Sequence, residues 1–265
     1  MAVTLTVLAS GSGGNCSLLS TNRTRILVDA GLSCRETLRR LENSGEGSQG
    51  ISAILITHEH SDHVNGLYQL ARKLKATVYI TGGTHDAWRR QVKASGKNDL
   101  ARVEHFAAGT RFLVGDIEVL PFTIPHDATD PVGFAFSAEG VKIGIATDLG
   151  YIPANVVDAI RGCDGLVIES NHDLDMLRTG PYPWTVKQRV MSKKGHLSND
   201  SLAQFFLSDY DGGAAFLVLA HLSEHNNHPE IARGAAERAL GPRRDLLRNQ
   251  LMLASQDAPL DPIRL

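Results

Sequence analysis

A histidine-rich segment is the part of this chain best suited to chemistry. Residues 56–66 read ITHEHSDHVNG and follow an apolar run, so His58, His60, Asp62 and His63 fall within six positions. Imidazole and carboxylate groups are common ligands of divalent transition metals. Four such ligands this close together favour two ions side by side over one closed structural site. The alternative is a polar loop in which Asp62 caps a helix.

Three further candidate ligands stand alone later in the chain. His126, Asp148 and His221 each follow an apolar run that is typical of a strand. Strand ends at one edge of a sheet are where open α/β folds gather their functional groups. His58 also follows such a run. We therefore expect the four side chains to meet at one edge of a sheet. Taken singly, each could instead be a loop, turn or core residue.

In this order, the motif and the later residues resemble the metallo-β-lactamase-fold hydrolases, from about residue 4 to residue 240. The resemblance implies two metal sites, the first held by His58, His60 and His126 and the second by Asp62, His63 and His221. Asp148 would bridge both ions, and Asp62 counts among the catalytic residues as well. The implied nucleophile is a hydroxide between the ions. Mn²⁺ or Zn²⁺ would suit ligands that include no thiolate.

The expected elements alternate between strands and helices. Strand-like runs lie at Thr4–Ala9, Arg25–Asp29, Ala53–Thr57, Ala76–Ile80, Ile117–Ile124, Phe134–Ser137, Lys142–Ala146, Gly165–Ile168 and Ala214–Ala220. The pattern alone indicates mixed α and β structure, and the resemblance implies the α/β (α+β) class, as a four-layered αβ/βα sandwich. We expect one domain over residues 1–265. Residues 242–265 lose periodicity and contain Pro259 and Pro262, which predicts a C-terminal tail.

Composition narrows the classes of function. The net charge is −2, so no general basic field draws the protein to nucleic acid. Three widely spaced cysteines argue against a disulfide framework and favour a reducing compartment. No signal-peptide pattern or long apolar run occurs. We therefore expect a cytoplasmic protein without membrane contact, which makes a secreted β-lactamase role unfavourable.

Two segments favour a phosphodiester substrate. Glu169 ends an apolar run, and Gly195-His196-Leu197-Ser198 follows later. Similar segments occur in the nuclease branch of the family, including the tRNA 3′-end-processing endonucleases. That resemblance implies that His196 protonates the leaving oxygen and that Glu169 supports it, which is useful because an alkoxide leaves poorly. The alternative is that His196 only begins the next helix.

A local basic run leads to His196. Between Leu177 and Gly195 no acidic residue occurs, Tyr182 and Trp184 are interleaved, and there are five cations: Arg178, Lys187, Arg189, Lys193 and Lys194. Such a run can hold a phosphate backbone while aromatic rings stack on bases. We expect Lys193 and Lys194 to contact substrate. A solvated loop with its lysines pointing outward is the alternative.

Two polar segments are similar to the YycJ/WalJ branch, a bacterial group of 5′→3′ DNA exonucleases linked to DNA repair. One is Ser-Gly-Ser-Gly-Gly-Asn, ending at Asn15, and the other follows His221 and includes Asn226. The glycine loop lacks the last glycine of a dinucleotide fingerprint, since Cys16 stands there, and more simply forms a tight turn near the metals. Asn15 and Asn226 are candidate substrate-binding residues, with a turn role as the default for Asn15.

The resulting expectation is a 5′→3′ exonuclease that acts on DNA rather than RNA, with room for a repair-protein partner. A small-molecule thioester, lactone or ester hydrolase of the same fold is the main competitor. An RNA-processing endonuclease and a binding module on a decayed scaffold are further alternatives. The metal ligands alone do not indicate which of these substrates is used. No sequence feature specifies an oligomeric state.

Overall fold

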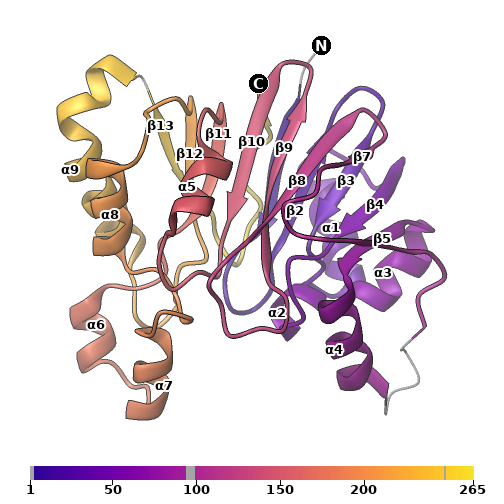
Figure 1. Cartoon of the computed structure of the whole chain (residues 1–265), viewed down its shortest axis with the longest axis horizontal. Helices are drawn as coiled ribbons and strands as arrows, with labels where there is room; N and C mark the ends of the chain where they lie inside the picture. The colour runs from indigo at the N-terminus through magenta and orange to yellow at the C-terminus, as the bar shows by residue number, and fades with distance from the viewer. Residues whose placement is uncertain (1–2, 94–98, 248) are drawn as a thin grey trace.

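The computed structural model describes residues 3–93, 99–247 and 249–265. Two seven-stranded mixed sheets lie face to face (Figure 1). The first sheet has the order β14 (Ile263–Arg264), β1 (Thr4–Ala9), β2 (Cys16–Ser20), β3 (Arg25–Val28), β4 (Ile51–Leu55), β5 (Thr77–Thr81) and β6 (Val103–Phe106). The second has the order β13 (Gln250–Leu253), β12 (Phe216–Ala220), β11 (Gly165–Glu169), β10 (Val141–Ala146), β9 (Val132–Ala138), β8 (Ile117–Thr123) and β7 (Phe112–Val114).

Helices cover the outer faces of both sheets. The helices beside the first sheet are α1 (Cys34–Asn43), α2 (Ser61–Val64), α3 (Leu67–Leu74) and α4 (Gly82–Val92). Those beside the second are α5 (Ala154–Ile160), α8 (Asn199–Ser208) and α9 (Pro229–Leu247), while α6 (Leu174–Thr179) and α7 (Trp184–Val190) extend past its lower edge in Figure 1. The predicted four-layered sandwich is confirmed.

The central strands are buried on both faces. In β1, Leu5 and Val7 pack between the sheets, whereas Leu8 packs under the helices. In β11, Val167 faces the other sheet and Leu166 faces the helices. Because side chains alternate along a strand, double burial requires nearly continuous apolar runs. This is why those runs predicted the strands without strict alternation.

Parallel pairing brings several strand ends to one edge. Strands β3 to β6 run parallel in the first sheet, and β10 to β13 run parallel in the second. Their carboxyl ends meet at the lower edge of the molecule in Figure 1, beside α2. The chain beyond β4, β10, β11 and β12 carries the candidate site residues.

The C-terminal residues differ from the prediction of a tail. Helix α9 continues past Gly241 to Leu247, β13 pairs with β12, and β14 pairs with β1. Strands this short have no periodicity of their own to reveal them. Pro259 and Pro262 lie in the connection between β13 and β14. Within the described residues, no helix is long and apolar enough to span a bilayer.

Candidate metal centre and active site

Three histidines converge on one point beyond the end of β4. His58 Nε2 lies 3.1 Å from His60 Nδ1, and His126 Nε2 lies 3.2 Å from the same His60 atom. Ligand atoms around a tetrahedral ion with bonds of about 2.1 Å are separated by roughly 3.4 Å. The geometry therefore suits one ion held by His58, His60 and His126, the set that the sequence predicts.

A second cluster lies beside the first and contains Asp62, His63, Asp148 and His221. His63 Nε2 is 3.4 Å from Asp62 Oδ2 and 3.4 Å from Asp148 Oδ2. His221 Nε2 is 3.5 Å from Asp62 Oδ2 and 3.5 Å from Asp148 Oδ1. These separations again match the ligands of a single ion.

Among the described residues, two buried atoms of the second cluster find no hydrogen-bond partner. They are Asp148 Oδ2 and His221 Nε2. An unsatisfied buried polar atom costs about 1–3 kcal/mol, and a cation between these atoms would remove that cost. The two clusters therefore fit divalent metal ions. Asp148 belongs to the second cluster and not to the first, so its role as a bridge stays a prediction.

Four of the five candidate ligand imidazoles are oriented through Nδ1, the ring atom that faces away from the clusters. The Nδ1 contacts are His58 to Thr57 Oγ1 at 3.0 Å, His63 to Asp29 Oδ2 at 2.7 Å, His126 to the Gly195 carbonyl at 3.2 Å, and His221 to Glu169 Oε1 at 2.8 Å. An acceptor at Nδ1 fixes the tautomer that leaves Nε2 free for a metal. Asp29 therefore orients the ring of His63.

The backbone is strained where three site residues leave their strands. Asp29, Asp148 and His221 have φ values of 62°, 60° and 55°. Only Lys75 and Glu139 share such a conformation among the other described non-glycine residues. The left-handed region costs these side chains of order 1 kcal/mol or more each, and such residues concentrate at functional sites. The sharp turns direct all three side chains into one site.

Glu169 joins the metal clusters to His196. Its Oε1 lies 2.8 Å from both His196 Nδ1 and His221 Nδ1, and its Oε2 accepts hydrogen bonds from the Leu149 and Leu197 amides. These four contacts occupy both oxygens of a fully buried carboxylate. Glu169 is therefore arranged to orient its neighbours, although it also lies among groups that could hold a metal.

The buried carboxylates carry negative charge at neutral pH. Burial raises the pKa of Glu169, but His196 and His221 lower it to about 2. Burial likewise opposes ionisation of Asp148, yet His221 and His63 hold its pKa well below the usual range. Charge of this sign beneath the imidazoles favours cation binding.

The four predicted substrate-binding residues lie in different surroundings. Lys193 and Lys194 are exposed, and a Cβ added at Gly150 would meet the Lys193 backbone at 2.4 Å, which places this loop beside the Asp148 turn. Asn15 is buried, and its Nδ2 lies 3.3 Å from Asp62 Oδ2. Asn226 is only 1% exposed and bonds to Ser223 Oγ, so the structure does not bring it to the site surface.

A buried amide network supports the loops that carry the site, and no sequence pattern predicted these contacts. Asn227 Nδ2 donates to the Ser170 and Asn171 carbonyls, and its Oδ1 accepts from Asn199 Nδ2 at 2.9 Å. Ser170 follows Glu169, and Asn199 begins α8 just after His196. These contacts therefore connect three loops of the active site.

Replacement of Asn227 by alanine should destabilise the protein by about 2–4 kcal/mol, because it leaves buried donors and acceptors unpaired. Urea unfolding followed by circular dichroism measures this change. The matched control is Asn155→Ala, since Asn155 is exposed and makes one bond to the Thr123 carbonyl. Equal effects of the two substitutions would contradict a supporting role for the network.

Gly31 supports the histidine motif by close approach. A Cβ at this position would lie 1.6 Å from the Asp62 carbonyl oxygen. Because that oxygen belongs to the backbone, the clash could be relieved only by moving the main chain. Gly31→Ala should displace the motif, destabilise the fold by about 1–3 kcal/mol or more, and reduce metal content. Gly82→Ala is the control, because a Cβ there meets nothing within 4 Å. Unchanged metal content in Gly31→Ala would refute this expectation.

Comparison with known proteins identifies the family. A family model described as a beta-lactamase superfamily domain matches residues 24–221. The chain belongs to this superfamily. It is 38% identical over 240 residues to the exodeoxyribonuclease YycJ of Bacillus anthracis, covering 91% of this chain and 90% of that protein. It is also 38% identical to the exodeoxyribonuclease WalJ of Streptococcus pneumoniae D39, covering 85% and 84%.

Solved structures of the superfamily share the fold. The metallo-beta-lactamase fold protein YhfI of Bacillus subtilis superposes with a TM-score of 0.72 over 98% of this chain and 99% of that protein, at 16% identity. The predicted resemblance to the metallo-β-lactamase family and its YycJ/WalJ branch is confirmed. The chain is thus a metal-dependent hydrolase of this fold.

Proposed function

We propose that this protein is a 5′→3′ DNA exonuclease that works in DNA repair in the cytoplasm. The observation that carries the proposal is the His196–Glu169 pair, with 2.8 Å between Nδ1 and Oε1, beside a cluster suited to a metal. A positioned acid is most useful when the leaving group is an alkoxide, as in a phosphodiester. The names of the relatives at 38% identity support DNA as the substrate and the exonuclease mode.

The proposed metal site holds two ions, Mn²⁺ or Zn²⁺. His58, His60 and His126 would hold one, Asp62, His63 and His221 the other, and Asp148 would contact both. Such ions would activate a water molecule for attack on phosphorus and neutralise charge on the phosphoryl oxygens. Imidazole and carboxylate ligands accept either metal.

The side chains of the protein supply the remaining steps. Glu169 fixes the His196 ring through Nδ1, so Nε2 is the atom that can donate a proton to the departing 3′ oxygen. Asn15, which contacts Asp62 and His63, positions these ligands. The exposed Lys193 and Lys194 lie where they can hold the phosphate backbone next to the Asp148 turn.

End-labelled nucleic acids test the proposal. Metal-stripped protein is reloaded with Mn²⁺ or Zn²⁺ and given single-stranded and duplex DNA and RNA, each with a free or a chemically blocked 5′ end. We expect stepwise release of mononucleotides from free 5′ ends of DNA and protection by the 5′ block. Cleavage of RNA alone would favour a processing endonuclease. No cleavage by fully loaded protein would favour a small-molecule ester or thioester hydrolase.

A further inference from the structure

One large aromatic side chain is mostly exposed to solvent. The protein has two tryptophans; Trp88 is 1% exposed in the core of the first sheet, whereas Trp184 at the start of α7 is 61% exposed. Tryptophan contributes most when it is buried or covered by a partner. An exposed tryptophan on the segment that leads to His196 is therefore a candidate contact for a ligand.

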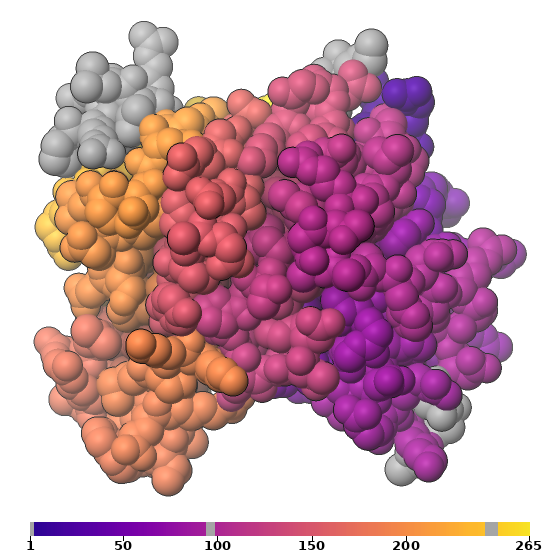
Figure 2. Space-filling model, in the orientation of Figure 1, coloured from indigo at the N-terminus to yellow at the C-terminus, as the bar shows by residue number. Residues whose placement is uncertain are grey.

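The surrounding segment, residues 174–194, forms what we call the α6–α7 lobe. Figure 2 shows this lobe projecting at the lower left, across a recess from the region of α4 at the lower right. The recess lies over the sheet edge where the site residues meet. A nucleic-acid strand that enters the site through this recess would therefore pass alongside the lobe.

Most polar groups of the lobe are already engaged. Lys187 is buried, and its Nζ donates to the Arg178 carbonyl at 2.8 Å. The Tyr182 ring packs edge to face on His225 at 5.8 Å. The exposed side chains that remain to meet a ligand include Trp184 at the start of α7, and Lys193 and Lys194 between α7 and His196.

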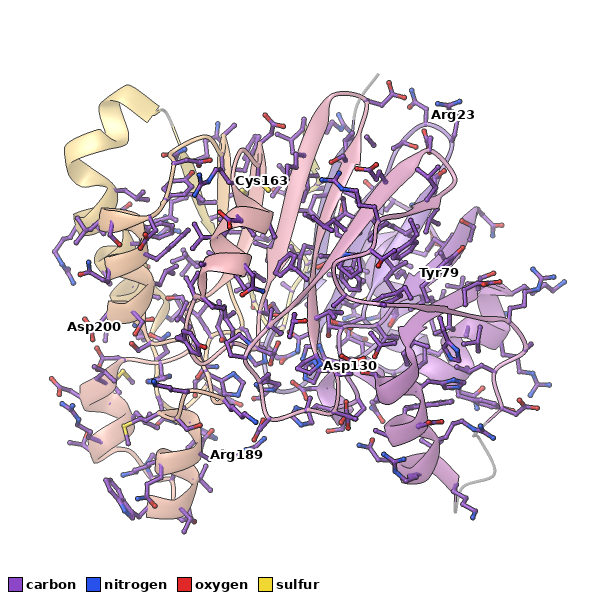
Figure 3. The ribbon with its side chains drawn as sticks, viewed as in Figure 1. Arg23, Tyr79, Asp130, Cys163, Arg189 and Asp200 are labelled. Carbon is purple, nitrogen blue, oxygen red and sulfur yellow. The ribbon has the colours of Figure 1, made fainter. Side chains whose placement is uncertain are left out.

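Contacts from the lobe hold it in a fixed position relative to the site. Arg189 forms an ion pair with Asp127, the residue that follows the candidate ligand His126. Figure 3 shows Arg189 extending from α7 toward the lower centre of the molecule. The Gly195 carbonyl at the end of the lobe contacts His126 Nδ1. The lobe is thus anchored to the first metal cluster, and Trp184 is held at a set place from it.

We infer that the α6–α7 lobe binds the unpaired strand of the substrate, with Trp184 stacked on a base and Lys193 and Lys194 on the intervening phosphates. The inference rests on the proposed function and deepens it. Between Leu177 and Gly195 the segment has cations and no acidic residue, and such a run suits a phosphate backbone. A single strand fits better than a duplex, because only unpaired bases expose their faces for stacking.

Substrates of different length distinguish strand binding by Trp184 from a structural role of this residue. Trp184→Ala should raise KM about 5- to 100-fold for a single-stranded oligodeoxythymidine of about a dozen nucleotides, with kcat nearly unchanged. The dinucleotide d(TpT) and bis(p-nitrophenyl) phosphate are too short to reach the lobe, so their hydrolysis should not change. Trp184→Phe should restore much of the affinity. Leu113→Ala, which alters another exposed apolar side chain (67%) on β7, is the control.

The outcomes are distinguishable. If wild-type protein cleaves the diester but no DNA, the proposed function fails and this inference fails with it. If wild-type protein cleaves DNA and Trp184→Ala leaves KM for the long strand unchanged, only this inference fails. Equal losses on the long strand and on bis(p-nitrophenyl) phosphate would show a structural role and would also overturn it.

Fluorescence gives a readout that is independent of cleavage. Trp88 is buried, so a phosphorothioate-linked oligodeoxythymidine that resists cleavage should quench the emission of Trp184 selectively. The quenching should disappear in Trp184→Phe. Absence of quenching at saturating oligonucleotide, or an equal effect in Trp184→Phe, would contradict stacking.

Discussion

Replacement of Asp148 by alanine is expected to lower hydrolysis roughly a thousand-fold or more and to reduce bound metal below two equivalents. Asp148 is buried, its Oδ2 has no other partner, and it lies 3.4–3.5 Å from His63 Nε2 and His221 Nε2. The substitution removes a ligand and leaves the imidazoles without the negative charge that favours a cation. Metal content by mass spectrometry and turnover of bis(p-nitrophenyl) phosphate measure the two effects.

The control for this variant is Asp158→Ala on α5, where the carboxylate is exposed and pairs with Arg161. The control should keep full metal content and activity. Retention of two equivalents and of wild-type turnover by Asp148→Ala would contradict the assignment of the second cluster.

His196→Ala is expected to slow DNA hydrolysis by about 10²–10⁴-fold while slowing a p-nitrophenyl phosphodiester only a few-fold. The reason is the leaving group, since an alkoxide needs a proton during departure and p-nitrophenolate does not. Rates for the two substrates under identical metal loading measure the difference. Glu169→Gln should show a weaker form of the same selectivity, because Glu169 orients the His196 ring.

A matched control for His196→Ala is His85→Ala, which changes a half-buried histidine that contacts the exposed His105. This control should leave both rates unchanged. Equal losses on both substrates in His196→Ala would argue that His196 is a metal ligand or a structural residue and not a general acid.

The ligand clusters could be predicted because their residues occur at strand ends. Apolar runs mark β4, β10 and β12, and the residue types just beyond them, His58, Asp148 and His221, have few structural uses there. Parallel pairing within each sheet and the packing of the two sheets then bring the residues to one edge. A residue that directly follows an apolar run must lie at the end of a strand, so its position can be predicted from one sequence.

The supporting contacts could not be predicted in this way. Thr57 bonds to Asp29 across two strands, and Asn227 joins loops that are 28 and 57 residues away. Such partners are set by tertiary packing and leave no periodic signal. Likewise β2 is a short run, CSLLS, and α4 begins with two glycines, which are poor helix formers. Packing against the first sheet outweighs that propensity.

The chemistry of the cleaved bond gives the most direct test of the central claim, that this site hydrolyses phosphodiesters from the 5′ end of DNA. A single-stranded oligonucleotide is digested by fully metal-loaded protein in ¹⁸O-labelled water, and the products are identified by mass spectrometry. We expect 5′-mononucleotides with a free 3′ hydroxyl, and every one after the original 5′-terminal nucleotide carries one ¹⁸O on its phosphate. Nucleotides that carry a 3′ phosphate, or no release of nucleotides at all, would contradict it.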